Sequence, residues 1–570
     1  AARPQAGIAL CRPPRARPLR LRGIASGTML SWLGAAGPGT AARALADGCA
    51  RCAASRPATP VVASAALHRL QSSPATSGGL QALPRFGGPA GFATLTADTL
   101  PRKVLECEYA VRGAVLLKAE ELQKKLLVPP SNPEERLPFS KIVPCNIGNP
   151  QAVGQEPLLF HRQLLACLAE PSLVKRADLF PEDVRERASK YLSGIHDGRA
   201  GAYSHSKGHA TFRKEVAQWL LQRDGFEADP EHIFLTDGAS AAVKMVMQLA
   251  VRGPEDGVLL PIPQYPLYSA TMTLLGGKSV GYFLNEEAGW SIDIEELERA
   301  VGEFRKSGGQ PRAIAVINPG NPTGQVLSRE VMEGVLRFAE KERLMVLADE
   351  VYQDNIHNPG KQFISFRKLA RELGSTVEVF SFHSVSKGVT GECGLRGGLV
   401  HCHNVDPAVI DQMYKLASIS LCSNVLGQAL MASVVTDPPK DGPSWESFEG
   451  TRRMVHEQLR RKAQRVTEKL NTIDGISCQP IEGAMYAFPR VTIKGYVVKK
   501  AISLATPADQ IYCLEMVDRT GIVTVPGSGF GQKPGTFHFR MTILPDEETL
   551  EKVLQDIETF HKQHAEGWFQ

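Results

Sequence analysis

The sequence predicts an α/β protein with two folded domains. The larger is a three-layer α/β/α domain around a mostly parallel seven-stranded sheet, and the smaller is an α+β domain. Seven short apolar or β-branched runs recur between residues 232 and 402, and amphipathic helical segments separate most of them. Strands that alternate with helices form βαβ units, which build a parallel sheet with helices on both faces. After residue 450 the pattern changes to one long helix followed by isolated strands, which predicts the second domain.

The expected elements follow from the periodicity of apolar residues. Strands of the central sheet are expected at 232–236, 257–262, 279–284, 312–318, 344–350, 377–383 and 397–402, with helices at 240–251, 293–306 and 329–342. Helices at 105–126, 156–169, 181–193 and 209–224 and a short strand ending at Cys145 precede the sheet. A helix at 452–473, strands near 475–491 and 536–544 and a helix at 546–565 follow it.

These limits divide the chain into four segments. We expect a leader at 1–95, an N-terminal arm with the first part of the small domain at 96–195, a large domain at 196–430, and the rest of the small domain at 431–570. A chain of 570 residues is too long for one ordinary core, which agrees with more than one domain.

The leader differs from the rest of the chain in charge. Residues 1–95 contain eleven Arg, no Lys and one acid, Asp47, so their net charge is +10. The whole chain has a net charge of +5, so the remaining residues carry −5. A basic, acid-poor segment rich in Ala and Ser is typical of an organellar transit peptide, and a merely disordered tail is the alternative. We expect import into the mitochondrial matrix, or into a plastid as the alternative. A weakly acidic body argues against nucleic-acid binding.

Two other classes of protein are disfavoured. No apolar run approaches the roughly 18 residues that a membrane span needs, so we expect no membrane insertion. The eleven cysteines show neither the spacing of a disulfide framework nor that of a metal site. Cys49 and Cys52 have redox spacing but lie in the low-complexity leader. We therefore expect free thiols and no bound metal.

The segment 381–398, SFHSVSKGVTGECGLRGG, contains a lysine in unusual surroundings. Lys387 follows an apolar strand and stands among small and hydroxyl residues, where its amine can attack an aldehyde. Ser384, Ser386 and Arg396 can together bind a phosphate. A surface lysine at a strand end is the plain alternative for Lys387.

Two further motifs follow neighbouring strands. In ADEVY (348–352), Asp349 can hold a protonated ring nitrogen and Tyr352 can donate to a phenolate oxygen, although Asp349 alone also suits a helix N-cap. In NPGNPTG (318–324), the Asn321 amide can reach the same oxygen, or the loop can be structural.

Two more motifs complete the set. TDGAS (236–240) ends at the start of a helix, where the free backbone amides of Ala239 and Ser240 form an anion site. In PQYP (263–266), Tyr265 can stack on an aromatic ring, or can be a turn aromatic packed on the surface. Since the motifs follow strands of one predicted sheet, we expect them to meet at its carboxyl edge.

This ordered set resembles the class I/II aminotransferases of fold type I, which use pyridoxal 5′-phosphate. That family has, in order, a phosphate-binding glycine turn, a stacking aromatic, Asn-Pro-x-Gly, Asp-x-x-Tyr, Ser-x-x-Lys and Arg, and this chain contains each. The resemblance implies that Lys387 is the Schiff-base lysine and proton-transfer base, and that Asp349 and Tyr352 assist it.

The resemblance assigns three additional residues. Arg540, in FHFRMTIL (537–544), matches the arginine that binds the substrate carboxylate, with Gly148 and Asn321 beside it. Tyr203, in GAYSHSKG (201–208), matches the tyrosine that reaches the phosphate of a neighbouring subunit, which implies a homodimer.

Several stretches over residues 100–565 are similar to the alanine aminotransferases, one branch of the family. They are EYAVRG (108–113), CNIGNPQAVGQEP (145–157), PIPQYPLYSA (261–270), VINPGNPTGQV (316–326), LADEVYQDN (347–355), SKGVTGECGLRGG (386–398), IEGAMYAFPR (481–490) and VPGSGFGQ (525–532). One departure is Val389, where relatives usually carry an aromatic residue, and this puts the packing beside the lysine in doubt.

The resemblance implies a ping-pong reaction that converts L-alanine and 2-oxoglutarate into pyruvate and L-glutamate. Three alternatives remain at this point. They are a glutamate–glyoxylate aminotransferase, another reaction on the same fold such as elimination from S-adenosylmethionine, and a non-catalytic binding protein. Comparing pyruvate with glyoxylate as amino-group acceptor tests the glutamate–glyoxylate alternative, and analysis of the products tests the second. A non-catalytic protein would be expected to lack the lysine, the aspartate or the arginine.

Overall fold

The computed structural model describes residues 95–109, 113–128, 130 and 132–567. Most of the expected leader, including Cys49 and Cys52, lies outside the described residues. The description below concerns the compact unit that begins at Phe92.

A seven-stranded sheet forms the centre of the large domain. Its strands are β2 (Ile233–Thr236), β3 (Asp256–Ile262), β4 (Lys278–Phe283), β5 (Gln310–Ile317), β6 (Met345–Asp349), β7 (Val379–Ser384) and β8 (Gly398–His403). They lie in the order β2-β8-β7-β6-β5-β3-β4. β8 pairs antiparallel with both of its neighbours, and every other pairing is parallel. The predicted mostly parallel seven-stranded sheet is therefore confirmed.

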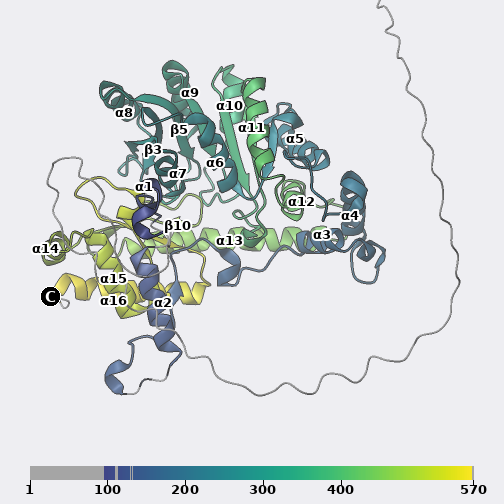
Figure 1. Ribbon diagram of the computed structural model, residues 1–570. Helices are drawn as coiled ribbons and strands as arrows, with labels where there is room; N and C mark the ends of the chain where they lie inside the picture. The colour runs from purple at the N-terminus through teal and green to yellow at the C-terminus, as the bar shows by residue number, and fades with distance from the viewer. Residues whose placement is uncertain (1–94, 110–112, 129, 131, 568–570) are drawn as a thin grey trace, which may run out of the picture. The chain divides into compact units, whose positions relative to one another are not determined.

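Helices cover both faces of the sheet (Figure 1). Because side chains alternate along a strand, Ile314 and Val316 of β5 face one core, and Ala313, Ala315 and Ile317 face the other. The first core is covered by α8 (Ile294–Lys306), α9 (Arg329–Glu342) and α10 (Phe366–Leu373). The second is covered by α6 (Ala239–Ala250), α7 (Leu267–Leu275) and α11 (Pro407–Ile419).

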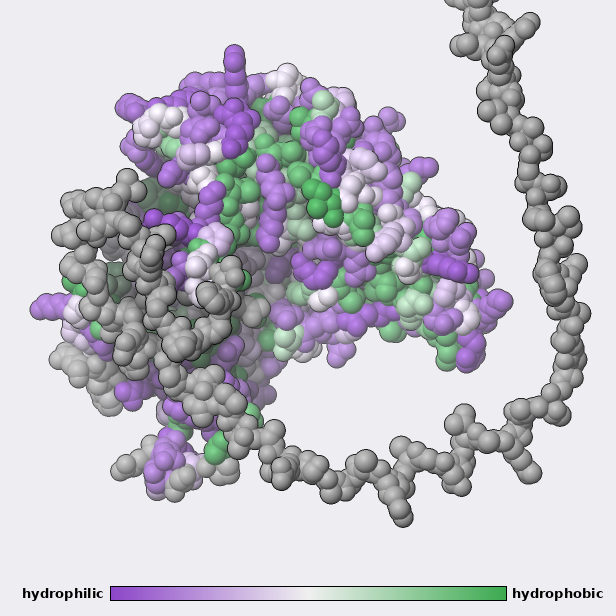
Figure 2. Space-filling model, viewed as in Figure 1, coloured by the Kyte–Doolittle hydropathy of each residue, from purple (hydrophilic) through white to green (hydrophobic). Residues whose placement is uncertain are grey.

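The β2 end of the sheet packs against helices from before and after it in the sequence. α5 (Ala210–Asp224) and α12 (Val425–Val434) contact β2 and each other. α3 (Leu159–Ala169) packs on α12 and on α4 (Glu182–Gly194). Hydrophobic side chains gather between the helices of the large domain on the face that Figure 2 shows.

The small domain combines helices with short strands. Its helices are α2 (Ala114–Leu126), α13 (Trp445–Leu470), α14 (Gly495–Ser503), α15 (Ala508–Thr520) and α16 (Glu547–Glu566). β1 (Val143–Pro144) pairs with β12 (Ile522–Val523), β9 (Ile476–Ser477) pairs with β11 (Arg490–Val491), and β14 (Phe539–Thr542) lies between β10 (Tyr486–Ala487) and β13 (Val525–Pro526). Phe448 near the start of α13 packs on Phe160 of α3, and the same helix contacts α16, so α13 links the two domains.

One expected helix is wrong in its extent. The segment 105–126 is not one helix: α1 (Arg102–Leu105) ends before Glu106, and α2 begins at Ala114 after an extended Gly113. Gly disfavours helix interiors, and the side chains of Cys107 and Tyr109 instead bond to the α7 region. Helices α7, α10, α11, α12, α14 and α15 were not among the expected elements. Helices α7, α10 and α14 have fewer than ten residues, and α12 is buried along most of its length, so a helical period is hard to recognise in these four.

Two negative expectations concern the described residues. The eight cysteines in this part of the chain are free thiols. None of the described helices is both long enough and apolar enough to span a bilayer.

Candidate active site

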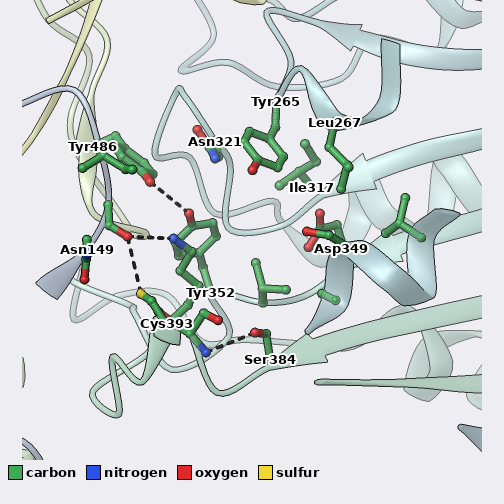
Figure 3. Close-up of a pocket in the computed structure, with 18 of the residues that line it drawn as sticks. Asn149, Tyr265, Leu267, Ile317, Asn321, Asp349, Tyr352, Ser384, Cys393 and Tyr486 are labelled. Atoms are coloured by element: carbon green, nitrogen blue, oxygen red, sulfur yellow. Dashed lines mark hydrogen bonds between the residues drawn. The ribbon is translucent and has the colours of Figure 1, made fainter. Parts of the chain in front are cut away.

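A cavity of about 270 Å³ opens at the carboxyl edge of the sheet (Figure 3). The parallel strands end there, and the antiparallel β8 begins there, so Arg396 reaches the same edge from before its strand. Residues of the small domain form the opposite wall, where Figure 3 shows Asn149 and Tyr486 across from Asp349. The lining includes the predicted site residues Gly148, Ala239, Ser240, Tyr265, Asn321, Asp349, Tyr352, Ser384, Lys387, Arg396 and Arg540.

Lys387 follows β7 and extends across the cavity toward the small domain. Its Nζ donates to the carbonyl oxygen of Gly148 over 3.0 Å and lies 5.6 Å from the ring centre of Tyr352. The thiol of Cys393 contacts the same carbonyl at 3.8 Å. The contact of Lys387 with a backbone carbonyl, rather than with a carboxylate, leaves its amine without an ionic partner among the described residues.

Asp349 ends β6 and is buried. Burial raises the pKa of this carboxyl to about 6, while Tyr268, the backbone of Val351 and the charge of Lys387 act in the opposite direction. Tyr268 donates to Oδ2 over 2.9 Å, but Oδ1 has no hydrogen-bond partner among the described residues. A buried acceptor without a partner is costly, so this oxygen faces a place where a donor is expected.

The turn before α6 meets the loop before β8 and makes a narrow, polar recess. A Cβ added at Gly238 would lie 2.2 Å from Arg396 Nη2, and one at Gly398 would lie 2.6 Å from the Ala239 nitrogen. Arg396 donates to Ser386 Oγ over 3.4 Å and to the Asp237 carbonyl over 3.1 Å. The first turn of α6 adds unpaired backbone N–H groups, so the recess suits an anion.

Tyr352 and Tyr486 meet on the side of the cavity near Lys387. The Tyr352 hydroxyl donates to that of Tyr486 over 3.4 Å, and Tyr265 lies beside Asn321 (Figure 3). Burial raises the pKa of Tyr352 well above its ordinary value. Burial also opposes ionisation of Tyr486, but the charges of Lys387 and Arg540 outweigh it and lower that pKa. Tyr352 is therefore a donor that stays protonated.

Arg540 on β14 is fully buried, and its guanidinium contacts four residues. Its Nη2 donates to the Asn146 carbonyl over 2.5 Å and its Nη1 donates to Asn321 Oδ1 over 3.1 Å. Its guanidinium carbon lies 4.2 Å from the ring centre of Tyr486 and 4.7 Å from that of Phe530. Among the described residues its bonds go to an amide oxygen and a backbone carbonyl rather than to a carboxylate, and its Nε has no partner there. A buried guanidinium of this kind is ready to bind a carboxylate.

The structure does not bring Tyr203 into this cavity, because that side chain is 75% exposed on its own chain. The cavity lining also contains Tyr109, Cys393 and Tyr486, which the sequence did not single out, and Tyr268, outside the lining, donates to Asp349. Tyr268 had a signal, since it lies one helical turn after Tyr265. Tyr109 and Tyr486 come from segments far away in the sequence, and no local pattern identifies them.

Comparison with known proteins identifies the family. The sequence model described as aminotransferase class I and II matches residues 174–557. The chain belongs to this family. It is an aminotransferase, and the resemblance read from its motifs is confirmed.

Individual aminotransferases are similar over most of this chain. Alanine aminotransferase 2, mitochondrial, of Arabidopsis thaliana is 45% identical over 475 residues, which are 82% of this chain and 87% of the relative. Alanine aminotransferase 1 of Homo sapiens is 46% identical and covers 82% of this chain and 94% of its own length.

Solved aminotransferase structures agree in fold. An alanine aminotransferase from Pyrococcus furiosus superimposes with a TM-score of 0.64 at 25% identity, covering 81% of this chain and all of its own. Aspartate aminotransferase from Thermus thermophilus in complex with maleate reaches 0.60 at 21% identity, covering 81% and 99%, and it supports the fold alone.

Proposed function

We propose that this aminotransferase binds pyridoxal 5′-phosphate and transfers the amino group of L-alanine to 2-oxoglutarate, giving pyruvate and L-glutamate. The observation that carries the proposal is the convergence of Lys387, the unpartnered Asp349 oxygen and the buried Arg540 on one cavity. The choice of alanine is supported by the names of relatives that are 45–46% identical to this chain.

The residues of the cavity fit the cofactor of this family. Asp349 Oδ1 lacks a donor, and a protonated ring nitrogen would supply one. Arg396, Ser384, Ser386 and the start of α6 would hold the phosphate, and the absence of a side chain at Gly238 lets Arg396 approach the start of that helix. Lys387 would bind the aldehyde, Tyr265 would cover the ring, and Tyr352 with Asn321 would contact its phenolate oxygen. When bound, the cofactor supplies an electron sink that stabilises negative charge at the substrate Cα.

The chain's own residues would then position the substrate and move its proton. Arg540 would hold the α-carboxylate, and its contacts with Asn321, Asn146, Tyr486 and Phe530 fix the direction of the guanidinium. Lys387 Nζ, opposite Gly148, would remove the Cα proton as the general base. Tyr352 stays protonated and would donate a hydrogen bond throughout.

A coupled assay of the purified protein tests the substrate assignment. We expect turnover of L-alanine with 2-oxoglutarate, and pyruvate as a product. Glyoxylate offered in place of 2-oxoglutarate or pyruvate tests the near alternative, a glutamate–glyoxylate aminotransferase. If glyoxylate is the better acceptor and alanine is a poor donor, the assignment of alanine as substrate is wrong. The roles proposed for the cavity residues in transamination are not affected by that result.

We also propose that the enzyme works as a homodimer in which Tyr203 reaches the cofactor phosphate of the partner subunit. The 75% exposure of Tyr203 on its own chain and its absence from that chain's cavity lining support this proposal. Light scattering should give twice the chain mass, and Tyr203→Phe should weaken cofactor binding. An active monomer would contradict the proposal.

The leader is proposed to direct the enzyme to the mitochondrial matrix, with a plastid as the alternative. Its Arg-rich, acid-poor composition supports import, and relatives from Arabidopsis thaliana and Dictyostelium discoideum are named mitochondrial. Residues 1–95 fused to a fluorescent protein should accumulate in mitochondria. Fluorescence that remains in the cytosol would contradict import.

A further inference from the structure

A pair of phenol hydroxyls stands in the wall of the cavity. Tyr109 and Tyr265 both line it, and their hydroxyl oxygens lie 2.6 Å apart. Their rings meet edge to face, with centres 6.3 Å apart and planes at 74°. Each phenol has one hydrogen to donate, and the bond between them uses only one. The second hydrogen is therefore available to an acceptor that enters the cavity.

Both hydroxyls are held where they are. The segment that carries Tyr109 runs along α7 in the opposite direction, since Lys103 Nζ donates to the Leu275 carbonyl over 3.1 Å and the Cys107 thiol contacts the Ala270 carbonyl at 3.6 Å. Burial raises the pKa of Tyr265 well above its ordinary value, so this phenol stays neutral. The two anchored phenols therefore form a site of hydroxyl donors.

Each cationic side chain of the described cavity lining already has a role in the proposed function. Among the described residues that line the cavity, the cationic side chains are Lys387, Arg396 and Arg540. In the proposed function these serve the cofactor aldehyde, the phosphate and the α-carboxylate. Alanine and pyruvate need nothing more. Glutamate and 2-oxoglutarate carry a second carboxylate, and none of these three described cations is left to bind it.

We propose that the hydroxyl pair of Tyr109 and Tyr265 binds this second carboxylate, so that the dicarboxylic half-reaction uses it and the alanine half-reaction does not. The inference rests on the proposed function. A carboxylate accepts strongly from O–H donors, and such charge-assisted bonds are stronger than neutral ones. When alanine is bound, the two hydroxyls still bond to each other, whereas a buried cation at this place would be left without a partner.

Equilibrium binding of unreactive acids to the cofactor-loaded enzyme tests the proposal. Glutarate carries two carboxylates and propionate carries one, and neither has an amino or keto group. In Tyr109→Phe, calorimetry should show glutarate bound about tenfold more weakly, as expected for loss of a hydrogen bond to a charged group, with propionate unchanged. Unchanged propionate binding also shows that the variant is folded.

Tyr496→Phe is the matched control. It removes a phenol hydroxyl from the small domain, away from the cavity lining, where that hydroxyl has no hydrogen-bond partner among the described residues. We expect it to bind both acids as the wild type does. Equal weakening of glutarate in both variants would overturn the proposal.

The two half-reactions give a second readout. In Tyr109→Phe, kcat/KM for glutamate and 2-oxoglutarate should fall about tenfold, and that for alanine and pyruvate should change less than about twofold. An equal fall in both halves would make Tyr109 a structural residue and overturn the inference. Failure of the wild type to use alanine would instead refute the proposed function, and the comparison of glutarate with propionate would still decide the role of Tyr109.

Discussion

Tyr268 donates its hydroxyl to Asp349 Oδ2 over 2.9 Å, while Oδ1 of the same buried carboxylate has no hydrogen-bond partner among the described residues. Tyr268 lies in the first turn of α7, and Leu267 of the same helix lines the cavity, so one helix both forms part of the cavity wall and supports the acid at the sheet edge. The carboxylate is therefore fixed in direction but only half satisfied. Its free oxygen is costly to the fold and available for binding.

The first prediction concerns Asp349→Asn in the cofactor-free protein. Burial raises the pKa of Asp349 from 3.8 to about 6, so the folded state binds this proton more tightly than the unfolded state does. The carboxyl therefore favours folding only at low pH, and its contribution is lost as pH rises from about 4 through 6. At pH 8 the asparagine variant should be more stable than the wild type by about 2–3 kcal/mol, since one pKa unit corresponds to about 1.4 kcal/mol.

Urea unfolding at pH 4.5 and pH 8 measures this difference. The advantage of the variant should be much smaller at pH 4.5, where the wild-type carboxyl is largely protonated in the folded protein. Burial raises the pKa of the neighbouring Glu350 to about 7, and the charge of Asp349 adds to this rise. The substitution removes that repulsion at pH 8, so Glu350 acts in the same direction as the predicted difference. A variant that is equally or less stable at pH 8 would show that Asp349 is already satisfied.

The second prediction concerns Tyr268→Phe. The Tyr268 hydrogen bond lowers the pKa of Asp349, so its removal should move that pKa further above 6. A smaller fraction of the carboxylate is then charged at pH 7, and we expect the apparent dissociation constant for pyridoxal phosphate to rise several-fold. The rise should shrink toward pH 9, where the carboxylate ionises again. A rise that is the same at both pH values would point to lost packing.

The extent to which the site follows from sequence differs among its residues. Lys387, Asp349, Asn321 and Arg396 all lie at the end or the beginning of strands, and strand order in an α/β sheet brings such positions together. Local patterns of apolar residues located these strands to within two residues or so. The convergence of the four residues therefore follows from the strand positions and from the fixed handedness of βαβ connections, so a single sequence is enough to predict it.

Other residues depend on contacts that no local pattern encodes. Tyr486 and Asn146 reach Arg540 through the packing of the small domain, and Tyr109 reaches Tyr265 across 156 positions of sequence. The arm was expected to be helical through this region, since its apolar residues suit a helix, but docking on α7 holds Cys107 and Tyr109 in an extended segment. Tertiary contacts overrode the local preference.

The third prediction concerns Lys387→Ala. Without its amine, the enzyme has no group to bind the cofactor aldehyde or to take the Cα proton, so transamination and the absorbance band of the bound aldehyde should be lost together. Lys499→Ala changes an exposed lysine of α14 and should keep both. Full turnover in Lys387→Ala would mean that another residue is the base.

The last prediction concerns Arg540→Leu. If Arg540 binds the α-carboxylate, which every substrate carries, KM should rise about a hundredfold or more for alanine and 2-oxoglutarate alike, because a buried carboxylate loses its ionic partner. Arg540→Lys should recover little, since an ammonium cannot keep the bonds to Asn321 and Asn146 while also gripping a carboxylate from the side.

Comparing Arg540→Leu with Tyr109→Phe separates the α-carboxylate site from the site of the second carboxylate. Loss of the α-carboxylate site should affect both half-reactions equally, whereas loss of the phenol pair should affect only the dicarboxylic one. An Arg540→Leu enzyme with unchanged KM for alanine but a raised KM for 2-oxoglutarate would reverse these assignments. Arg540 would then bind the second carboxylate, and the α-carboxylate would have to be held elsewhere in the cavity.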